Sequence, residues 1–374
     1  MIQTCGFPTS GHHALAAQER NRPAALRKLR GRARFGAKAL GEKMRVAVLD
    51  DWQHVAKKSA DWAQLEARGI AVSYFSEPLG SGDAAVSALA DFEFLVVMRE
   101  RMAFPASLIA RLGKLRMISL TGRRSPVLDT EACTRHGILV SHTGGELSSA
   151  ATAEIALGLL IGAMRHMPAG DDAVRGGKFQ SVVPTGTVLE GRTLGVIGLG
   201  RIGERMARYG HALGMRVLGW SPNLTKERAE SAGAAFATKE QLLAESDAVS
   251  LHIVLSEKTR GLLGAEDLAR MKPGAVLVNS SRFALVDETA LIAALRAGRI
   301  IAALDVFPEE PLPAGHPLLA CPNAVFTPHL GYCVNDVYAQ FYADSIANIL
   351  AFLDGRPVRM INPEALMHRA EETR

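Results

Sequence analysis

Three polar stretches in the second half of the sequence each follow an apolar run with the length of a β-strand. They contain Arg282, Glu310 and His329, respectively. Such apolar runs predict buried strands. The carboxyl ends of parallel strands meet at one edge of a sheet, where open α/β folds bind ligands. Each residue alone would be an ordinary turn or surface residue. Together they offer a guanidinium for an anion, a carboxylate, and an imidazole that can move a proton near neutral pH.

A glycine-rich turn lies upstream of these stretches, with the sequence Gly198-Leu199-Gly200-Arg201-Ile202-Gly203. It separates a predicted strand, 193–197, from a predicted helix, 204–213, and a second strand follows at 216–220. In that setting the first glycine permits a tight turn, the second lets the backbone approach a pyrophosphate, and the third lets helix and strand pack closely. Backbone N–H groups at the helix start would face the phosphates. A ligand-free turn is the alternative, and the flanking elements argue against it. We therefore expect a dinucleotide to contact the residues Gly198, Gly200, Arg201, Ile202 and Gly203.

Composition indicates a globular protein of about two domains, with 374 residues, 48% hydrophobic and 22% charged. The net charge of +5 is misleading, because residues 1–43 contain nine Lys/Arg and only two acids. The rest of the chain is slightly acidic, so no basic surface for nucleic acid is expected.

Residues 1–43 form a basic N-terminal extension with little periodicity. An Arg-rich, acid-poor segment is typical of a transit peptide. Alternatively, it is disordered sequence upstream of a natural start at Met44. The second interpretation is favoured because a predicted strand begins directly after Met44. Starting the protein at Met44 is expected to leave activity and thermal midpoint unchanged, and loss of either would show that the extension packs on the body.

The four cysteines show no metal-ligand spacing, so we expect free thiols, a reducing and hence cytoplasmic compartment, and no metal site. The longest apolar run, 155–164, is too short to span a bilayer. No membrane partner is therefore expected.

From residue 44 to 142 the pattern alternates between strands and helices. Predicted strands are 46–49, 70–74, 94–97, 117–120 and 138–140. Predicted helices are 52–67, 83–90, 105–112 and 130–136. This alternation indicates a doubly wound parallel sheet.

A second unit of the same kind follows Gly144-Gly145. An apolar helix, 148–166, leads into a Gly- and Pro-rich connection, 167–192. Further strands after 216–220 are predicted at 234–236, 248–251, 275–278, 300–304 and 324–326. Helices are predicted between them at 226–232, 240–244, 265–271 and 288–297. A long amphipathic helix, 334–353, is expected to return the chain to the first domain.

The sequence resembles the D-isomer-specific 2-hydroxyacid dehydrogenases from residue 44 to about 362. The resemblance rests on GLGRIG (198–203), MKPGAVLVNSSR (271–282), ALDVFPEEP (303–311) and TPHLG (327–331). The segment RERMAFP (99–105) is similar to a subgroup loosely like phosphoglycerate dehydrogenase.

The resemblance implies an α/β protein with two doubly wound parallel-sheet domains. A flavodoxin-like substrate (catalytic) domain would comprise 44–147 and 334–374. A Rossmann NAD(P)-binding domain would comprise 148–333. The chain would transfer a hydride between NAD or NADP and a D-2-hydroxy acid/2-oxo acid pair.

The family's catalytic Arg, Glu and His fall on Arg282, Glu310 and His329. His329 would exchange the hydroxyl proton while hydride leaves C2. Glu310 nearby would favour the imidazolium. Arg282 would bind the substrate carboxylate and polarise the 2-oxo group.

The resemblance also assigns binding residues. Asp305 would accept a hydrogen bond from the nicotinamide amide, with Gly331 beside the same ring. Ser280 and Ser281 would line the cofactor. The substrate carboxylate would be held by loops that contain Arg99 and Gly122. Asp287, by contrast, is expected only to cap the helix that follows it.

Three positions depart from the family pattern. Where NAD users carry an acid at the end of the second strand, this chain has Ser221, with Lys226 and Arg228 close in sequence. No carboxylate there repels a 2′-phosphate, so NADP as well as NAD could be the cofactor. The two cations could bind the phosphate, or they could simply be solvated. The glycine after the catalytic Arg is replaced by Phe283, which predicts a bulkier loop. A frequent Thr is replaced by Met102, which predicts a more apolar pocket.

The sequence is compatible with two functions of different classes. The leading one is a dehydrogenase of 2-hydroxy acids; the alternative is an NAD(H)-sensing, corepressor-like binding module on the same fold. The resemblance also implies a homodimer in which residues 148–190 cover the partner. The identity of the acid, and the physiological direction, do not follow from the sequence.

Overall fold

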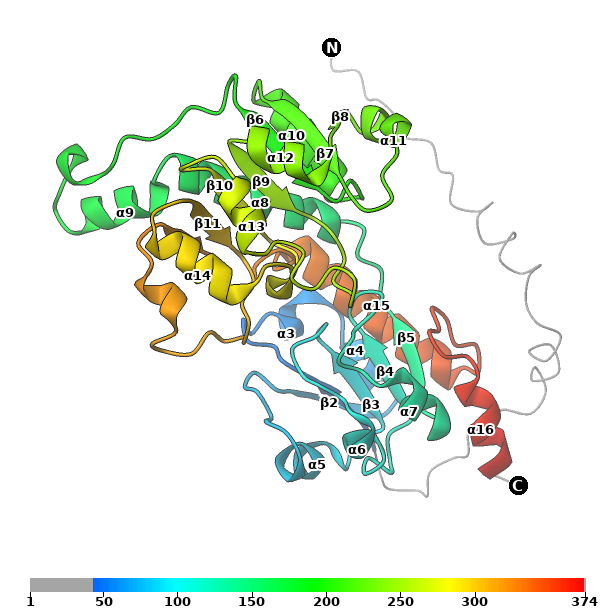
Figure 1. Cartoon of the computed structure of the whole chain (residues 1–374). Helices are drawn as coiled ribbons and strands as arrows, with labels where there is room; N and C mark the ends of the chain where they lie inside the picture. The colour runs from blue at the N-terminus through cyan, green and yellow to red at the C-terminus, as the bar shows by residue number, and fades with distance from the viewer. Residues whose placement is uncertain (1–42, 373–374) are drawn as a thin grey trace, which may run out of the picture. The chain divides into compact units, whose positions relative to one another are not determined.

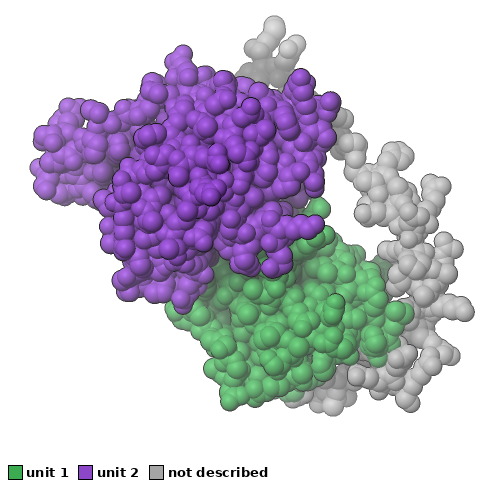
Figure 2. All heavy atoms as spheres, in the orientation of Figure 1, with its two compact units in different colours: residues 1–144, 339–374 green, residues 145–338 purple. Residues whose placement is uncertain are grey.

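The structure is a computed structural model that describes residues 43–372. The predicted extension 1–43, apart from Lys43, lies outside the described residues. The chain divides into two compact units (Figure 2). Within the described residues, unit 1 comprises 43–144 and 339–372, and unit 2 comprises Gly145–Tyr338.

Unit 1 is built on a five-stranded parallel sheet with strand order β2-β1-β3-β4-β5 (Figure 1). The strands are β1 (Met44–Val48), β2 (Ile70–Tyr74), β3 (Phe94–Val97), β4 (Met117–Leu120) and β5 (Leu139–His142). Helices between them are α5 (Asp83–Leu89), α6 (Ala106–Ile109) and α7 (Thr130–Arg135). This order is the flavodoxin-like one, so the predicted doubly wound architecture is confirmed for this unit.

The predicted helix 52–67 is wrong in detail. Two short helices occupy the segment, α3 (Ala56–Ser59) and α4 (Ala63–Glu66). Between them Ala60 is extended, with φ −154° and ψ 164°. The Asp51 carboxylate accepts the N–H groups of Val55 and Ala56, and so α3 begins four residues late. Local hydrogen bonding by an aspartate therefore overrode the helical periodicity.

The long helix α15 (Asn335–Leu353) and α16 (Ala365–Glu372) end the described chain. From Ala339 onward α15 belongs to unit 1. Its Ser345 hydroxyl hydrogen-bonds Ser119 of β4 at 3.0 Å, and the Asn348 amide donates to the same Ser119 and to the carbonyl of His142. Phe352 meets Phe94 edge-on with ring centroids 6.1 Å apart. The helix is thus fixed to the sheet by apolar contact and by satisfied buried polar groups.

Unit 2 contains a seven-stranded parallel sheet in the order β12-β11-β10-β9-β6-β7-β8 (Figure 1). Its strands are β6 (Thr193–Ile197), β7 (Arg216–Trp220), β8 (Ala235–Phe236), β9 (Ala248–Leu251), β10 (Val276–Asn279), β11 (Ile301–Leu304) and β12 (Ala324–Phe326). This is the Rossmann strand order with one added strand. Strands are added on one side of β6 up to β8 and on its other side from β9 onward, so the strand order reverses between β6 and β9. The predicted Rossmann domain is confirmed.

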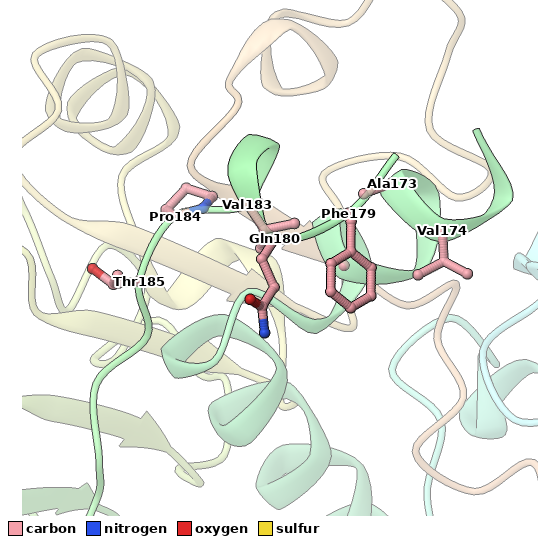
Figure 3. Close-up of a pocket in the computed structure, with 8 residues that line it drawn as sticks. Ala173, Val174, Phe179, Gln180, Val183, Pro184 and Thr185 are labelled. Carbon is pink, nitrogen blue, oxygen red and sulfur yellow. The ribbon is translucent and has the colours of Figure 1, made fainter. Parts of the chain in front are cut away.

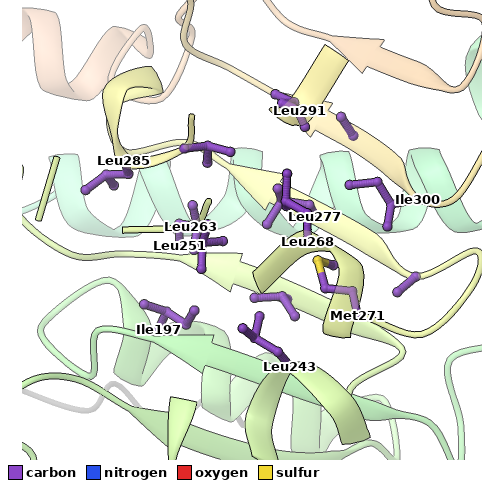
Figure 4. Packing of buried hydrophobic residues seen from close by; sticks show 14 of the residues in the cluster. Ile197, Leu243, Leu251, Leu263, Leu268, Met271, Leu277, Leu285, Leu291 and Ile300 are labelled. Atoms are coloured by element: carbon purple, nitrogen blue, oxygen red, sulfur yellow. The ribbon is translucent and has the colours of Figure 1, made fainter. Parts of the chain in front are cut away.

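The connecting helices of unit 2 are α10 (Gly203–Ala212), α11 (Lys226–Ser231), α12 (Lys239–Glu245), α13 (Ala265–Arg270) and α14 (Glu288–Arg296). Leucines of α12, α13 and α14 pack on one face of the sheet, where Leu243, Leu268 and Leu291 meet Leu251 and Leu277 of the strands (Figure 4). The Asp287 side chain accepts the N–H of Ala290, so its predicted capping role is confirmed.

The segment before β6 differs from expectation. The apolar helix α8 (Ser148–Met164) stops early, because His166 adopts a left-handed conformation with φ 53°. The predicted connection 167–192 then contains a further helix, α9 (Met167–Arg175), with Pro168 in its first turn. Proline is well tolerated there, which explains how a Gly- and Pro-rich stretch forms a helix.

Two negative findings concern the described residues alone. Between residues 43 and 372, none of the helices is both long enough and apolar enough to span a membrane. The same part of the chain contains no group of three or more His, Cys, Asp or Glu placed to hold a metal ion. Cys133 and Cys321 are buried free thiols.

Candidate functional site

Glu310 and His329 form a close pair in unit 2. The Nδ1 atom of His329 lies 2.6 Å from Oε2 of Glu310. The other carboxylate oxygen, Oε1, accepts the backbone N–H of Phe307 at 3.0 Å. With Nδ1 held by the carboxylate, Nε2 is the ring nitrogen left to exchange a proton with another molecule.

The pKa of Glu310 lies below its ordinary value. Burial acts to raise this pKa, but the hydrogen bond and positive charge of His329 oppose it, together with the Phe307 N–H and the charge of Arg282. The carboxylate therefore stays ionised and able to hold a protonated imidazole. Arg282 is close enough for its positive charge to act on the Glu310 carboxylate.

Asp305 holds the turn that carries His329. It is 1% exposed, and its carboxylate accepts the hydroxyl of Thr327 at 2.6 Å and the N–H groups of Leu330 and Gly331 at 2.7 and 2.8 Å. His329 itself has φ 54°, a conformation that non-glycine residues seldom adopt. Hydrogen bonds on both sides of His329 fix the backbone of the turn that carries its ring. Burial raises the pKa of the Asp305 carboxyl, while these hydrogen bonds and the charge of His329 lower it.

The loop that carries Arg282 is fixed by the side chain of Asn279 at the end of β10. This amide is fully buried; it donates to the carbonyl of Arg282 at 3.0 Å and accepts the N–H of Ser281 at 3.0 Å. The Ser281 hydroxyl is bonded to the carbonyl of Leu251 at 2.7 Å. The hydroxyl of Ser280, in contrast, is buried without a partner among the described residues.

The glycine-rich turn has the shape that a dinucleotide needs. A Cβ atom at Gly198, where φ is 98°, would lie 2.5 Å from the carbonyl oxygen of His252, and one at Gly203 would clash with the carbonyl of Gly198. A Cβ at Gly200 would meet no heavy atom within 4 Å. The first and third glycines are therefore needed by the fold, while the second faces open space beside α10. An orphaned Ser280 hydroxyl and this open turn fit an NAD(P) molecule.

The end of β7 carries no acid. Ser221 is half-buried there, and the following loop leads to Thr225, which caps α11. Lys226 and Arg228 are exposed on that helix, and Lys226 lies 3.9 Å from Glu230. The two cations thus resemble ordinary solvated helix residues.

Arg99 and Gly122 lie side by side in unit 1, after β3 and β4. The guanidinium of Arg99 would be 3.1 Å from a Cβ atom at Gly122, so a side chain there would displace it. Arg99 has φ 49°, and its N–H donates to the hydroxyl of Thr121 at 3.0 Å.

The structure places both apolar departures in hydrophobic cores. Phe283 is 5% exposed and packs in the core of unit 2, so it does not enlarge the loop after Arg282. Met102 is 8% exposed and packs in the core of unit 1. In both cases an apolar side chain found a core within reach.

Sequence reasoning missed Asn279, Thr327 and Thr152 as supports of the site. The Thr152 hydroxyl, on α8, donates to the carbonyl of Gly331 at 2.9 Å. One signal was available for Asn279, since a polar side chain that ends an apolar strand must find partners. No comparable signal marks Thr152, which is far from Gly331 in sequence.

Known proteins are similar to this chain in sequence and in fold. The family model for the NAD binding domain of D-isomer specific 2-hydroxyacid dehydrogenases matches residues 157–331. The glyoxylate reductase of Aeropyrum pernix is 38% identical over 271 residues, which is 70% of this chain and 81% of that protein. The chain belongs to the D-isomer-specific 2-hydroxyacid dehydrogenase family.

Other members of the family agree. The D-3-phosphoglycerate dehydrogenase of Archaeoglobus fulgidus is 36% identical over 71% of this chain, which spans only 50% of that longer protein. The solved structure of a phosphoglycerate oxidoreductase from Vibrio cholerae superposes with a TM-score of 0.79 at 36% identity, and covers 83% of this chain and 99% of that one. This dehydrogenase is accordingly an oxidoreductase that uses NAD(P) and acts on the CH–OH group of 2-hydroxy acids. The relatives carry the names of enzymes, which supports that function over the corepressor-like module.

Proposed function

We propose that Arg282, Glu310 and His329 interconvert a D-2-hydroxy acid and its 2-oxo acid. The observation that carries the proposal is the 2.6 Å contact between His329 and Glu310. It sits in a turn fixed by the buried Asp305. Such an arrangement positions one imidazole nitrogen for proton exchange and stabilises its charged form.

The nicotinamide ring, when bound, supplies or accepts the hydride. In the direction of reduction, His329 Nε2 gives its proton to the substrate oxygen, and the Glu310 carboxylate stabilises the imidazolium beforehand. Arg282 binds the substrate carboxylate and polarises the 2-oxo group through its planar fork of donors. In oxidation the neutral imidazole takes the hydroxyl proton instead.

Binding roles are proposed for the remaining residues. The turn at Gly198, Gly200, Arg201, Ile202 and Gly203 would hold the pyrophosphate, and Ser221 would face the adenosine ribose. Near the nicotinamide end, the proposed contacts are with Ser280, Ser281, Asp305 and Gly331. Asp305 has already accepted three hydrogen bonds, but a carboxylate has about four acceptor sites, so one remains for an amide N–H. Arg99 and Gly122 are proposed to hold the substrate from unit 1.

The test is consumption of NADH and NADPH with a panel of 2-oxo acids, followed by absorbance. Turnover of at least one acid, lost in Arg282→Ala and His329→Ala, is the expected result. Tight cofactor binding without turnover of any acid would favour a binding module.

A homodimer is proposed as the working assembly. Apolar side chains are exposed on and after α9, including Met167 at 58%, Val174 at 65% and Phe179 at 71%. Val174 and Phe179 line a pocket of about 440 Å³ with Val183 and Pro184 (Figure 3). Exposed apolar patches of this kind mark protein interfaces. Light scattering at micromolar concentration should give a particle mass twice that of the chain. In Phe179→Glu the measured mass should be lower. A monomeric mass for the wild type would contradict the proposal.

The cytoplasm is proposed as the compartment. Its support is that Cys133 and Cys321 are free thiols, as expected under reducing conditions. Fractionation of cells that express the tagged chain would test the proposal.

A further inference from the structure

The ring of Tyr332 lies against the imidazole of His329, three residues earlier in the same turn. The two ring centroids are 5.7 Å apart, and the ring planes are inclined at 74°, which is an edge-to-face arrangement. Aromatic rings attract each other in this geometry beyond the effect of burial alone. Both residues belong to unit 2, so the contact is made within one unit.

The imidazole needs such a contact, because its other restraint acts on a single atom. The Nδ1 atom of His329 is held by Oε2 of Glu310 at 2.6 Å. The hydrogen bonds of Asp305 fix the backbone of the turn and do not reach the ring. The torsion that joins a histidine ring to its Cβ atom is soft. A ring held at Nδ1 alone can therefore tilt about that contact, and the tilt displaces Nε2.

Tyr332 is itself held firmly. It is 5% exposed, and its ring also meets the ring of Tyr338 edge-on, with centroids 6.3 Å apart and planes at 76°. The hydroxyl of Tyr338, in the first turn of α15, donates to Sγ of Cys333 at 3.2 Å. The carbonyl of Tyr332 accepts the N–H of Val334 at 2.9 Å. A ring fixed between two others is a rigid surface for the imidazole.

The exposure of the two rings separates their roles. The side chain of His329 is 27% exposed, as a group that exchanges a proton with another molecule must be. Tyr332 is almost wholly buried beside it. A residue that bound the substrate directly would present its polar atom or its ring face to solvent. The low exposure of Tyr332 therefore favours an action through His329.

We infer that Tyr332 is a positioning residue, whose ring holds the imidazole of His329 in the one orientation that lets Nδ1 meet Glu310. Nε2 then keeps a fixed position for proton exchange. The inference rests on the proposed function of His329. It assigns the effect to the ring of Tyr332 and not to its hydroxyl, so phenylalanine should replace tyrosine.

Kinetics of two variants over a panel of 2-oxo acids test this role. Tyr332→Leu should lower kcat by about tenfold for every acid that is reduced and leave KM within about twofold, because a misplaced proton donor slows the chemical step. Tyr332→Phe keeps the ring and should stay within about twofold of the wild type in kcat. Altered ratios of kcat/KM between acids in Tyr332→Leu would indicate direct contact with the substrate and overturn the inference.

A double-mutant cycle with Glu310 tests whether Tyr332 acts through the imidazole. In Glu310→Ala the ring has already lost its partner at Nδ1. Adding Tyr332→Leu to that variant should lower kcat by less than about threefold, because the two restraints serve one orientation. A second full loss of about tenfold would show that the two residues act independently, which contradicts the inference.

Tyr74→Leu is the matched control for the loss of an aromatic pair. Tyr74 meets Trp62 edge-on in unit 1, with ring centroids 5.8 Å apart. Both leucine variants should lower Tm, since each removes an edge-to-face pair. Only Tyr332→Leu should lower kcat. A similar fall of kcat in Tyr74→Leu would trace the loss to destabilisation and overturn the inference.

Crystal structures of the wild type and Tyr332→Leu test the inference without activity. We expect one imidazole orientation in the wild type and in Tyr332→Phe. In Tyr332→Leu we expect several orientations, or loss of the contact between Nδ1 and Glu310. A single, unchanged orientation in Tyr332→Leu would overturn the inference. Failure of the wild type to reduce any 2-oxo acid, or full turnover by His329→Ala, would instead contradict the proposed function.

Discussion

The ligand-binding edges of the two units differ in how their polar side chains are paired. In unit 2, Asp305 accepts three hydrogen bonds, Glu310 is held by His329 and Phe307, and Asn279 makes two hydrogen bonds. In unit 1, burial raises the pKa of the Asp50 carboxyl to about 6, against the effect of its charged and polar neighbours, which lower it. Both edges lie at the carboxyl ends of parallel strands, so topology alone does not explain the contrast.

The difference indicates a division of labour. Asp305, Glu310 and Asn279 are held by several hydrogen bonds each, although the Ser280 hydroxyl of the same edge has no partner among the described residues. Such bonding makes the geometry rigid, and proton transfer requires fixed geometry. Groups that the protein does not fully stabilise are available to a ligand, and they discriminate between ligands that can and cannot satisfy them. Unit 2 would therefore perform the chemistry, and unit 1 would select the acid.

The largest effect should come from the histidine. His329→Ala removes the group that exchanges the proton and should lower kcat by roughly 10²–10⁴-fold. The affinity for cofactor, measured by fluorescence titration, should change little. Near-normal turnover would remove His329 from the mechanism.

A smaller but clear loss is expected for Arg282→Lys. The planar guanidinium can bind a carboxylate through two parallel donors, which an ammonium cannot reproduce. The value of kcat/KM for 2-oxo acids should fall by about tenfold or more, roughly 1.4 kcal/mol. An unchanged value would exclude this role for Arg282.

The sequence predicted the features that depend on local patterns and missed those that depend on contacts between distant residues. The glycine-rich turn and the apolar strands rest on local patterns, and they predicted the Rossmann unit. The choice of Arg282, Glu310 and His329 as the catalytic set needed the family resemblance as well, and their roles remain a prediction. The support from Asn279 and Thr152 depends on hydrogen bonds that form only after folding. The helix predicted over 52–67 failed because one aspartate, Asp51, competed with the periodic pattern.

Cofactor choice should respond to a single residue at the end of β7. Without an acid at Ser221, the wild type should use NADH and NADPH with less than about a hundredfold preference, roughly 2.7 kcal/mol. Ser221→Asp should shift preference toward NADH, since a carboxylate accepts both ribose hydroxyls and repels a 2′-phosphate. Values of kcat/KM with each cofactor decide the matter. A wild-type preference for NADH beyond about a thousandfold would mean that another group excludes the phosphate.

The smallest effect concerns stability at acid pH. Because the pKa of Glu310 is lowered in the folded protein, its contribution is fully present above the ordinary carboxyl pKa and is lost as pH falls through the depressed value. The Tm difference between wild type and Glu310→Gln should therefore be largest near neutral pH and shrink in acid. A difference that grows on acidification would contradict the lowered pKa.

The division between the units is tested most directly by kinetics of two variants over one panel of 2-oxo acids. Glu310→Gln alters the proton-transfer pair of unit 2, and Arg99→Gln alters the proposed substrate loop of unit 1. We predict that Glu310→Gln lowers kcat by a similar factor for every acid, whereas Arg99→Gln raises KM and changes the ratios of kcat/KM between acids. A uniform loss of kcat in Arg99→Gln, with unchanged ratios, would contradict the account.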